Sequence, residues 1–524
     1  MPELPQIAVN MTLEDPSKAA ILGIKPSKPK VSNPFYQATE LDKKGKHKEA
    51  EKIYLELLNA DFDNPVLHAA LGMCYASIER NGLGAMCLKR ALENTDGILA
   101  GFKNLGVVPR TETPQAMDSF RAIKKSEILN ALGTCYKHEN KVDEARDLFI
   151  KAQEGIPLNA DIQNNLGTLY INEGKPAKAL EHLDLALTLQ HGHPQARWNK
   201  ALAHLELGDY VNGWANYDAG FDAQVRAERN YSASSLPRWK GQPGLNVVVY
   251  GEQGIGDEIM FASCLPDLLK DCKSVVFDCH KKLHSLFATS FPDIDIYPTR
   301  EDELITWPTL PDGTPRYQFD ARVAIGSIPA FYRPNLESFP GTPYIKPDVA
   351  KEAEWAVRLS KLSDRPKIGI SWVGGHKRTR IEVRSTPLET YLPILQQNAD
   401  FISLQYTPCE DEIAAFEKKH GIKIHHYPEA VYSPNYADTA ALVANLDLVI
   451  TVCTSVVHLA GSMGVPTWVL TPSRPAWRYR LDLDHLPWYG KSVTLFRQEH
   501  GTTDWTPVVA EVSEQLKFLI GSIK

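Results

Sequence analysis

Small hydroxyl residues follow an apolar strand in the last quarter of the chain. The run from Leu448 to Ile450 is typical of a parallel strand covered on both faces, and Thr451, Thr454 and Ser455 come directly after it, with His458 on the helix that follows. In open α/β sheets, ligands bind outside the carboxyl ends of strands, where free N–H groups and a helix amino end attract anions. The pattern predicts a phosphate-binding turn. An ordinary βαβ unit with Thr454 or Ser455 as a helix cap explains it equally well.

A second strand-to-helix turn carries an acid. The strand from Asn246 to Tyr250 runs into Gly-Glu-Gln-Gly-Ile-Gly-Asp-Glu, and its glycines allow a tight turn and a close approach to a ligand. Asp257 then lies at the amino end of a helix, whose field keeps a carboxylate ionised, as a general base must be. A helix-capping aspartate is the alternative, with Glu252 and Glu258 in reserve as bases. The residues expected to line the cleft beside Asp257 are Glu252, Gln253, Gly254 and Gly256.

The same glycine-rich turn is also compatible with a different class of ligand, a dinucleotide. Asp278 ends the next strand, 24 residues after Gly254, and such an acid after a glycine-rich turn is typical of dinucleotide sites. The G-x-x-G-x-G spacing is, however, the reverse of that fingerprint. We therefore rank a nicotinamide-dependent oxidoreductase far below the other interpretations.

A basic loop follows the strand that opens the second half of the α/β region. After Trp372 come Gly374 and Gly375, and then a series of basic residues: His376, Lys377, Arg378, Arg380 and Arg384. Fixed cations stabilise the charge that a leaving nucleoside diphosphate gains, most strongly in a water-poor cleft. Lys377 and Arg384 are the preferred pair, and a solvated loop is the alternative for each cation. With no D-x-D pair in a fitting position, we expect a transfer site that needs neither a metal nor a cofactor.

Two further polar residues extend the predicted donor site. Gln405 follows the strand at 401–404, and Asp438 precedes the helix around Leu442. Both flank the carboxyl edge of the predicted sheet, where they could contact a nucleobase or ribose; each fits equally well as a capping or strand-end group. The complete predicted donor site is Gly374, Gly375, Lys377, Arg384, Gln405, Asp438, Thr454, Ser455 and His458.

A helical repeat precedes the α/β region. Gly133, Gly167 and Ala201 are 34 residues apart, which is the period of the tetratricopeptide repeat, with small residues where paired helices touch. Earlier copies fit around Gly72 and Ala38, with an insertion at 95–121. The repeats predict a groove for a protein or peptide, and dimerisation is the rival role.

Short apolar strands then alternate with helices from residue 246 onwards. This alternation of strands and helices extends over too many residues for one small sheet and suits two Rossmann-like halves. The predicted domains are a flexible arm at 1–32, repeats at 33–230, a first α/β domain at 231–343 and a second at 344–524. The fold class is therefore a helical solenoid (α) followed by an α/β pair.

The charge and the cysteine content limit which partners and which cellular compartment the sequence allows. The net charge of -7 and pI near 6.2 argue against a general nucleic-acid or anionic-membrane binder. The eight cysteines are scattered and predict buried, reduced thiols rather than disulfides or a zinc site. No apolar run reaches the roughly 18 residues of a membrane span. We expect a cytoplasmic protein, with homo-oligomerisation through the repeats left open.

Several motifs resemble bacterial repeat-containing glycosyltransferases related to family 9, the heptosyltransferase-like enzymes, and more distantly the protein O-GlcNAc transferases. The donor signature D-T-x-x-x-H-L-A matches at Thr454, His458 and Ala460, but Cys453 replaces the usual aspartate. The other motifs lie at 214–217, 237–241, 250–258, 403–405 and 487–498. The resemblance implies a GT-B fold, Asp257 as the base and inversion at the sugar. Because Cys453 replaces the aspartate of the donor signature, the resemblance does not identify the donor sugar.

These patterns together predict a metal-independent glycosyltransferase. It would move a sugar from a nucleotide diphosphate donor to a hydroxyl of a protein, peptide or glycan presented near the repeats. Modified nucleic acid stays open as an acceptor, although it is disfavoured. The alternative is a catalytically idle scaffold, which the replacement at Cys453 favours.

Overall fold

The computed structural model describes residues 33–107, 113–231, 236–301, 307–375 and 380–522. Its contacts divide the chain into two compact units, Met1–Asn199 and Lys200–Lys524. The predicted arm at 1–32 lies outside the described residues. The predicted domain boundaries stay predictions.

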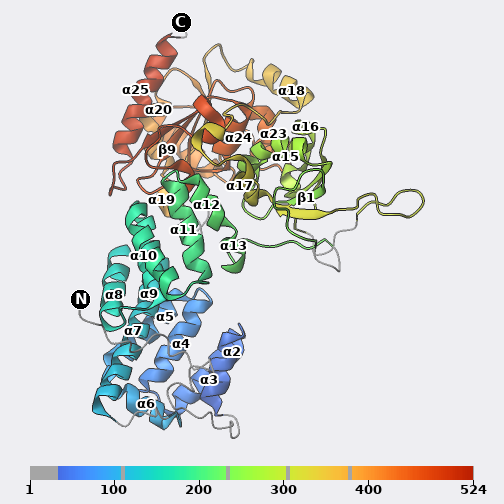
Figure 1. The fold of residues 1–524 in the computed structure, drawn as a ribbon. Helices are drawn as coiled ribbons and strands as arrows, with labels where there is room; N and C mark the ends of the chain where they lie inside the picture. The colour runs from blue at the N-terminus through green and yellow to red at the C-terminus, as the bar shows by residue number, and fades with distance from the viewer. Residues whose placement is uncertain (1–32, 108–112, 232–235, 302–306, 376–379, 523–524) are drawn as a thin grey trace, which may run out of the picture. The chain divides into compact units, whose positions relative to one another are not determined.

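The first unit is a series of helical hairpins (Figure 1). Its helices are α2 (Pro34–Lys43), α3 (His47–Ala60), α4 (Pro65–Ser77), α5 (Asn81–Glu93), α6 (Ile98–Asn104), α7 (Pro114–His138), α8 (Val142–Gly155), α9 (Ala160–Asn172) and α10 (Pro176–Leu189), and α11 (Pro194–Glu206) continues into the second unit. A Cβ at Gly133 would lie 2.7 Å from the Phe149 ring, and one at Gly167 would lie 2.7 Å from Leu183. Small residues at the repeat interval therefore let paired helices touch, as the spacing predicts.

The second unit opens with α12 (Tyr210–Tyr217) and α13 (Ala219–Asp222), which precede a first α/β lobe. Its four-stranded parallel sheet has the order β3-β2-β1-β4, with β1 (Asn246–Tyr250), β2 (Ser274–Asp278), β3 (Asp295–Tyr297) and β4 (Ala321–Ala324). Its helices include α14 (Ile255–Phe261), α15 (Leu265–Asp271), α16 (His284–Ser290) and α17 (Pro329–Tyr332). The order reverses between β1 and β4.

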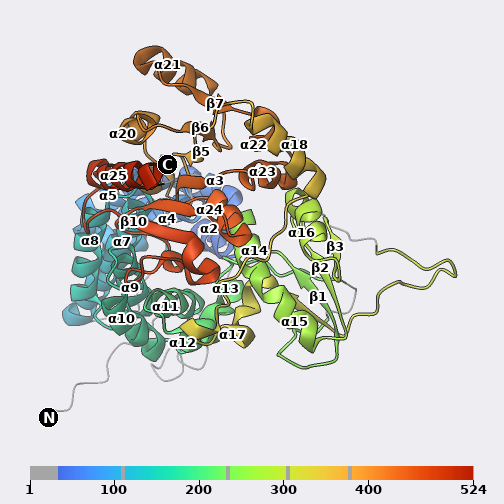
Figure 2. The ribbon, with the colours of Figure 1, turned by 90° about the horizontal axis from the view of Figure 1, so that it is seen from above.

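The second lobe repeats this plan on a six-stranded parallel sheet, ordered β10-β9-β8-β5-β6-β7 (Figure 2). The strands are β5 (Lys367–Ser371), β6 (Asp400–Ser403), β7 (Ile424–His426), β8 (Leu448–Val452), β9 (Thr467–Thr471) and β10 (Val493–Arg497). The helices are α18 (Val349–Leu359), α19 (Ile381–Arg384), α20 (Leu392–Leu395), α21 (Glu410–His420), α22 (Pro428–Val431), α23 (Tyr436–Val443), α24 (Ser455–Met463) and α25 (Thr506–Ser522). Chain order reverses between β5 and β8, the point at which doubly wound sheets bind ligands.

The closing helix α25 packs on the second lobe. Val508, Val512 and Leu516 belong to the same buried core as Ile368 and Phe401 of the sheet. The predicted fold class, a helical repeat region followed by two Rossmann-like α/β domains, is confirmed. All eight cysteines are buried and free of disulfides. Within the described ranges, no helix combines the length and apolar character that crossing a bilayer requires.

Candidate active site

The two lobes meet where α14 and α24 begin. Each of these helices starts just after the carboxyl end of a central strand, β1 and β8 respectively. A Cβ at Gly256 would lie 2.9 Å from the His458 ring and 3.4 Å from Ser455 Cα. Only a residue without a side chain lets the helices approach this closely. Gly256, Ser455 and His458, predicted from two distant motifs, therefore lie together.

Asp257, the predicted base, faces positive charge from the other lobe. It is the third residue of α14, and its carboxylate forms an ion pair with Arg478, which belongs to the short helix Trp477–Tyr479 after β9. The side chains are 20% and 15% exposed, respectively. Burial lowers the pKa of Arg478, but Asp257 and the neighbouring tyrosines together outweigh burial, and the net pKa is raised. Arg478 is therefore a fixed cation beside the acid.

Three arginines act electrostatically on Cys453 at the carboxyl edge of the second sheet. Burial raises the pKa of the Cys453 thiol to about 11, against the opposing charges of Arg384, Arg497 and Arg478. Arg384 ends α19, and Arg497 is the last residue of β10. A neutral thiol, unlike a carboxylate, does not neutralise the positive charge of these arginines. We call Arg384, Arg478 and Arg497 the arginine cluster.

His458 adds no charge to this cluster. It is buried, and burial together with Arg478 and Arg384 holds its pKa well below the usual value. Its Nδ1 lies 2.7 Å from the hydroxyl of Tyr489. A neutral imidazole here orients its neighbours and does not supply a proton at neutral pH.

The loops after β5 and β8 also touch. A Cβ at Gly374 would lie 2.8 Å from the carbonyl oxygen of Cys453, so glycine is required there. The Gly375 amide donates to the Tyr406 hydroxyl at 2.8 Å, and φ at Gly375 is 82°. This brings the start of the basic loop to the switch point of the sheet. Lys377 lies outside the described residues.

The predicted helix cap is present at the amino end of α24. The hydroxyl of Thr454 accepts from the Val456 amide at 3.2 Å, and that of Ser455 accepts from the Tyr436 hydroxyl at 3.1 Å. Both side chains lie at the helix amino end. Thr454 therefore fits the capping alternative, which does not conflict with an anion bound by the same turn.

Gln405 and Asp438 are engaged in other parts of the second lobe. The Gln405 side chain is 1% exposed; its oxygen accepts from Ser371, Trp372 and Val373, and its nitrogen donates to Val373 and Thr407. These bonds join the ends of two strands and favour the strand-end alternative. Asp438 pairs with Lys351 of α18 and accepts from Ser433.

Of the three acids in the first turn, Glu252 and Glu258 are held by arginines of their own lobe. Glu252 accepts from Arg226 at 2.8 Å, and Gln253 accepts from Tyr217 of α12 at 3.1 Å. Glu258 is fully buried against Arg300; burial raises its pKa to about 7, although Arg300 opposes the shift. Asp257 is thus the acid of this turn that reaches across to the second lobe.

Asp278, the acid that suggested a dinucleotide site, is also bonded to residues of the protein. Asp278 is buried and pairs with Arg229 at 2.6 Å, while Tyr231 and Thr299 each donate to it at 2.8 Å. These bonds fasten the loops around the first sheet. They occupy the carboxylate that a bound ribose would require.

Sequence reasoning missed Arg478 and Arg497 as members of the site. A usable signal was present, because Arg474, Arg478 and Arg480 all follow β9 at its carboxyl end, as the basic loop follows β5. The third of these is a structural residue, since Arg480 donates to Asp482 and to Tyr210 of α12.

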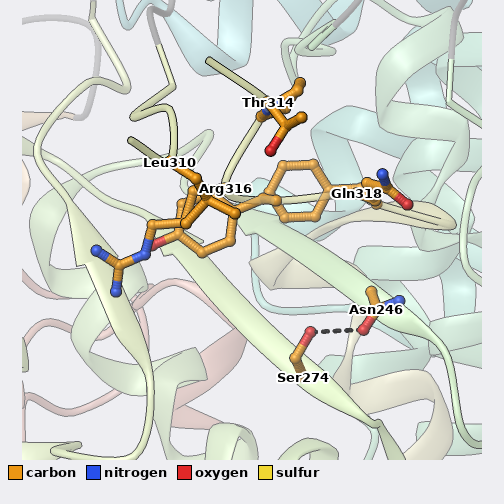
Figure 3. Close-up of a pocket in the computed structure, with 9 residues that line it drawn as sticks. Asn246, Ser274, Leu310, Thr314, Arg316 and Gln318 are labelled. Carbon is orange, nitrogen blue, oxygen red and sulfur yellow. Dashed lines mark hydrogen bonds between the residues drawn. The ribbon is translucent and has the colours of Figure 1, made fainter. Parts of the chain in front are cut away.

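A separate cavity of about 330 Å³ lies at the opposite edge of the first sheet (Figure 3). Asn246 and Ser274, the first residues of β1 and β2, line it and are joined by a 2.8 Å hydrogen bond. Leu310, Arg316 and other residues of the loop before β4 close it. It lies at the amino ends of the strands, so it is not part of the candidate site.

Comparisons with known proteins bear on both parts of the chain. Residues 160–191 match the tetratricopeptide repeat family model. The chain carries tetratricopeptide repeats. Protein FlbA of Caulobacter vibrioides is 28% identical over 435 residues, which cover 74% of this chain and 72% of that protein.

Two solved structures are each similar to a part of this chain. MamA is 18% identical, with a TM-score of 0.26, over 38% of this chain and 97% of that one. The E. coli ADP-heptose LPS heptosyltransferase II is 13% identical, with a TM-score of 0.37, over 53% of this chain and 99% of that one.

Proposed function

We propose that the protein is a glycosyltransferase that moves a sugar from a nucleotide diphosphate donor to an acceptor hydroxyl. The observation that carries the proposal is the pairing of Asp257 with Arg478 beside the arginine cluster. A partly buried group of cations suits a diphosphate that gains charge as the sugar bond breaks. The resemblance to family 9 adds direct attack with inversion, and the cluster supports transfer without a metal.

In this mechanism Asp257 accepts the proton of the attacking hydroxyl. The arginine cluster and the amino end of α24 hold the diphosphate, and Lys377 is proposed to join them. Arg478 has two partners in turn: Asp257 before the donor binds, and the diphosphate afterwards. Since one guanidinium cannot fully satisfy both, donor binding weakens its hold on Asp257 and releases the carboxylate to act as a base.

The repeats are proposed to recruit the acceptor or a partner. Asn165 donates to Asn130 at 2.9 Å, and Asn199 donates to Asn164 at 2.8 Å. These amides recur on α7, α9 and α11, the first helices of successive hairpins. Side-chain amides both donate and accept, so such a series suits the backbone of an extended peptide.

Donor hydrolysis tests the proposal. The purified protein is incubated with a panel of sugar nucleotides, and release of nucleoside diphosphate is measured. We expect slow release from at least one donor, reduced about 100-fold or more by Asp257→Asn, because general bases contribute 10²–10⁴-fold. Thermal unfolding of the variant should match that of the native protein. Release that Asp257→Asn leaves unchanged would exclude Asp257 as the base.

A catalytically idle scaffold is the second candidate. It is favoured by Cys453 in the position of the usual aspartate. The scaffold predicts no turnover with any donor and full partner binding by the Asp257→Asn protein. Absence of both nucleotide binding and turnover across the panel would favour it over the enzyme.

A further inference from the structure

Three side chains with metal-binding atoms converge in the first repeats, far in sequence from the transfer site. Asp42 lies near the end of α2, His47 begins α3 and Cys74 lies within α4. One ligand atom from each lies within 4.8 Å of the other two. Figure 1 shows these three helices as neighbours in the repeat unit. The group therefore depends on the packing of two successive hairpins.

We propose that Asp42, His47 and Cys74 bind a divalent transition-metal ion, with zinc as the best fit. Sulfur, imidazole nitrogen and carboxylate oxygen are the three ligand types that zinc takes in proteins. A thiolate and an imidazole disfavour magnesium and calcium, which prefer oxygen ligands. One carboxylate and one thiolate supply two negative charges, which balance the two positive charges of the ion.

The observed separations suit a tetrahedral ion. Zinc–ligand bonds of about 2.0–2.3 Å place ligand atoms about 3.3–3.8 Å apart. The His47 Nδ1 and Asp42 Oδ1 atoms are 2.6 Å apart, and the widest pair lies within 4.8 Å. Shifts of about 1 Å therefore convert the group into a coordination shell, with the ion entering between the ring and the carboxylate.

The group is open to solvent on the side of His47 and Asp42 and is closed by the protein on the side of Cys74. His47 is 24% exposed and Asp42 is 19% exposed, so an ion can enter from solvent. Cys74 is fully buried beneath them. Glu51 lies one helical turn after His47 on α3, but its carboxylate accepts from the Tyr75 hydroxyl at 3.0 Å and pairs with Arg80 at 3.4 Å. Water is therefore the fourth ligand in this proposal.

The surroundings of Cys74 argue against the rival role of a nucleophile. Its side chain is fully buried and its thiol donates to the His47 carbonyl oxygen at 3.6 Å. Reactive cysteines lie in partly exposed, electropositive surroundings. An ion that binds here displaces the thiol proton, so binding releases a proton to the buffer. The ion would join α2, α3 and α4 and so stabilise the first hairpin against the second.

Metal titration of the full-length, reduced and chelator-treated protein tests the site. We expect about one equivalent of Co²⁺ to bind with a thiolate-to-cobalt absorption band, and Zn²⁺ to abolish the band by displacement. Calorimetry in buffers of different ionisation enthalpy should show proton release. Zinc should also raise the unfolding temperature, because it binds the folded chain.

Variants separate the three ligands from other metal binders. Asp42→Asn, His47→Gln and Cys74→Ser should each weaken binding at least about 10-fold, the lower end of the effect of losing a supporting group. Cys87→Ser, which alters another buried repeat cysteine on α5, should bind normally. Asp42 and His47 are partly exposed, so their variants keep the fold even where Cys74→Ser does not, and circular dichroism verifies this.

Two results would overturn the site. One is the absence of stoichiometric binding, which would leave an ion pair beside a buried cysteine. The other is binding that keeps its strength and its absorption band in the Asp42 and His47 variants. Neither readout depends on glycosyl transfer, so the outcome is independent of the proposed function.

Discussion

Arg478 offers a sharp test of the transfer site, because it is the contact between the predicted base and the arginine cluster. Replacing Arg478 with glutamine removes one positive charge from this partly buried site while keeping a planar polar group. The side chain is 15% exposed, so an effective dielectric of about 20 applies, and a unit charge at about 4 Å then contributes about 4 kcal/mol. Competition with Asp257 before the donor binds reduces the net effect.

The expected loss in transition-state stabilisation is about 3 kcal/mol, within the range measured for single groups that stabilise developing charge. This corresponds to a decrease in kcat/KM of about 150-fold, since each 1.36 kcal/mol is tenfold. Arg478→Lys keeps the charge without the two-pronged geometry and should lose about 10-fold. Release of nucleoside diphosphate from the accepted donor, together with calorimetric binding of that diphosphate, measures both effects.

The matched control is Arg358→Gln, which alters an arginine of the same lobe that is 45% exposed and pairs with Glu429. Its activity should stay within about twofold of the native value, because exposed ion pairs contribute about 1 kcal/mol or less. Native turnover in Arg478→Gln would refute the reasoning, as would an equal decrease in the control. Unfolding curves of each variant separate loss of function from loss of fold.

Three further outcomes are expected. Gly256→Ala should lower turnover at least about 10-fold, because its Cβ would meet His458 at 2.9 Å and hold the lobes apart. Gly192→Ala, in a turn where an added Cβ meets no atom within 4 Å and φ is not positive, is the control for mutating a glycine; a fully active Gly256→Ala protein contradicts the close approach. The free energy of unfolding should decrease as pH falls below about 6.5, because the unfolded chain protonates His458 while the folded chain, with its depressed His458 pKa, resists protonation. Urea unfolding at a series of pH values should show a weaker slope for His458→Gln, and an unchanged slope rejects this account. Glu258→Ala should lower the free energy of unfolding by about 3 kcal/mol, because it leaves Arg300 without its buried partner; an effect near zero in denaturant titration contradicts a buried ion pair.

Much of the fold was predictable because it depends on local periodicity. The 34-residue interval of small residues led to the hairpins, and short apolar runs bounded by glycine led to the strands. Gly256 was also recognisable as a close-approach position, although the atoms that it approaches belong to another helix and not to a ligand. The carboxyl-edge rule placed the hydroxyl residues after β8 correctly near the switch point of the sheet.

By itself, the sequence determined the repeat class, the two α/β lobes and the loops that carry polar groups, because each follows from patterns within about 35 residues. Only tertiary structure decided which charges meet. Asp257 and Arg478 are separated by 221 positions, and Cys74 reaches His47 and Asp42 only when two hairpins pack. Charge interactions depend on distance through space and on burial, and neither quantity can be read from the order of residues.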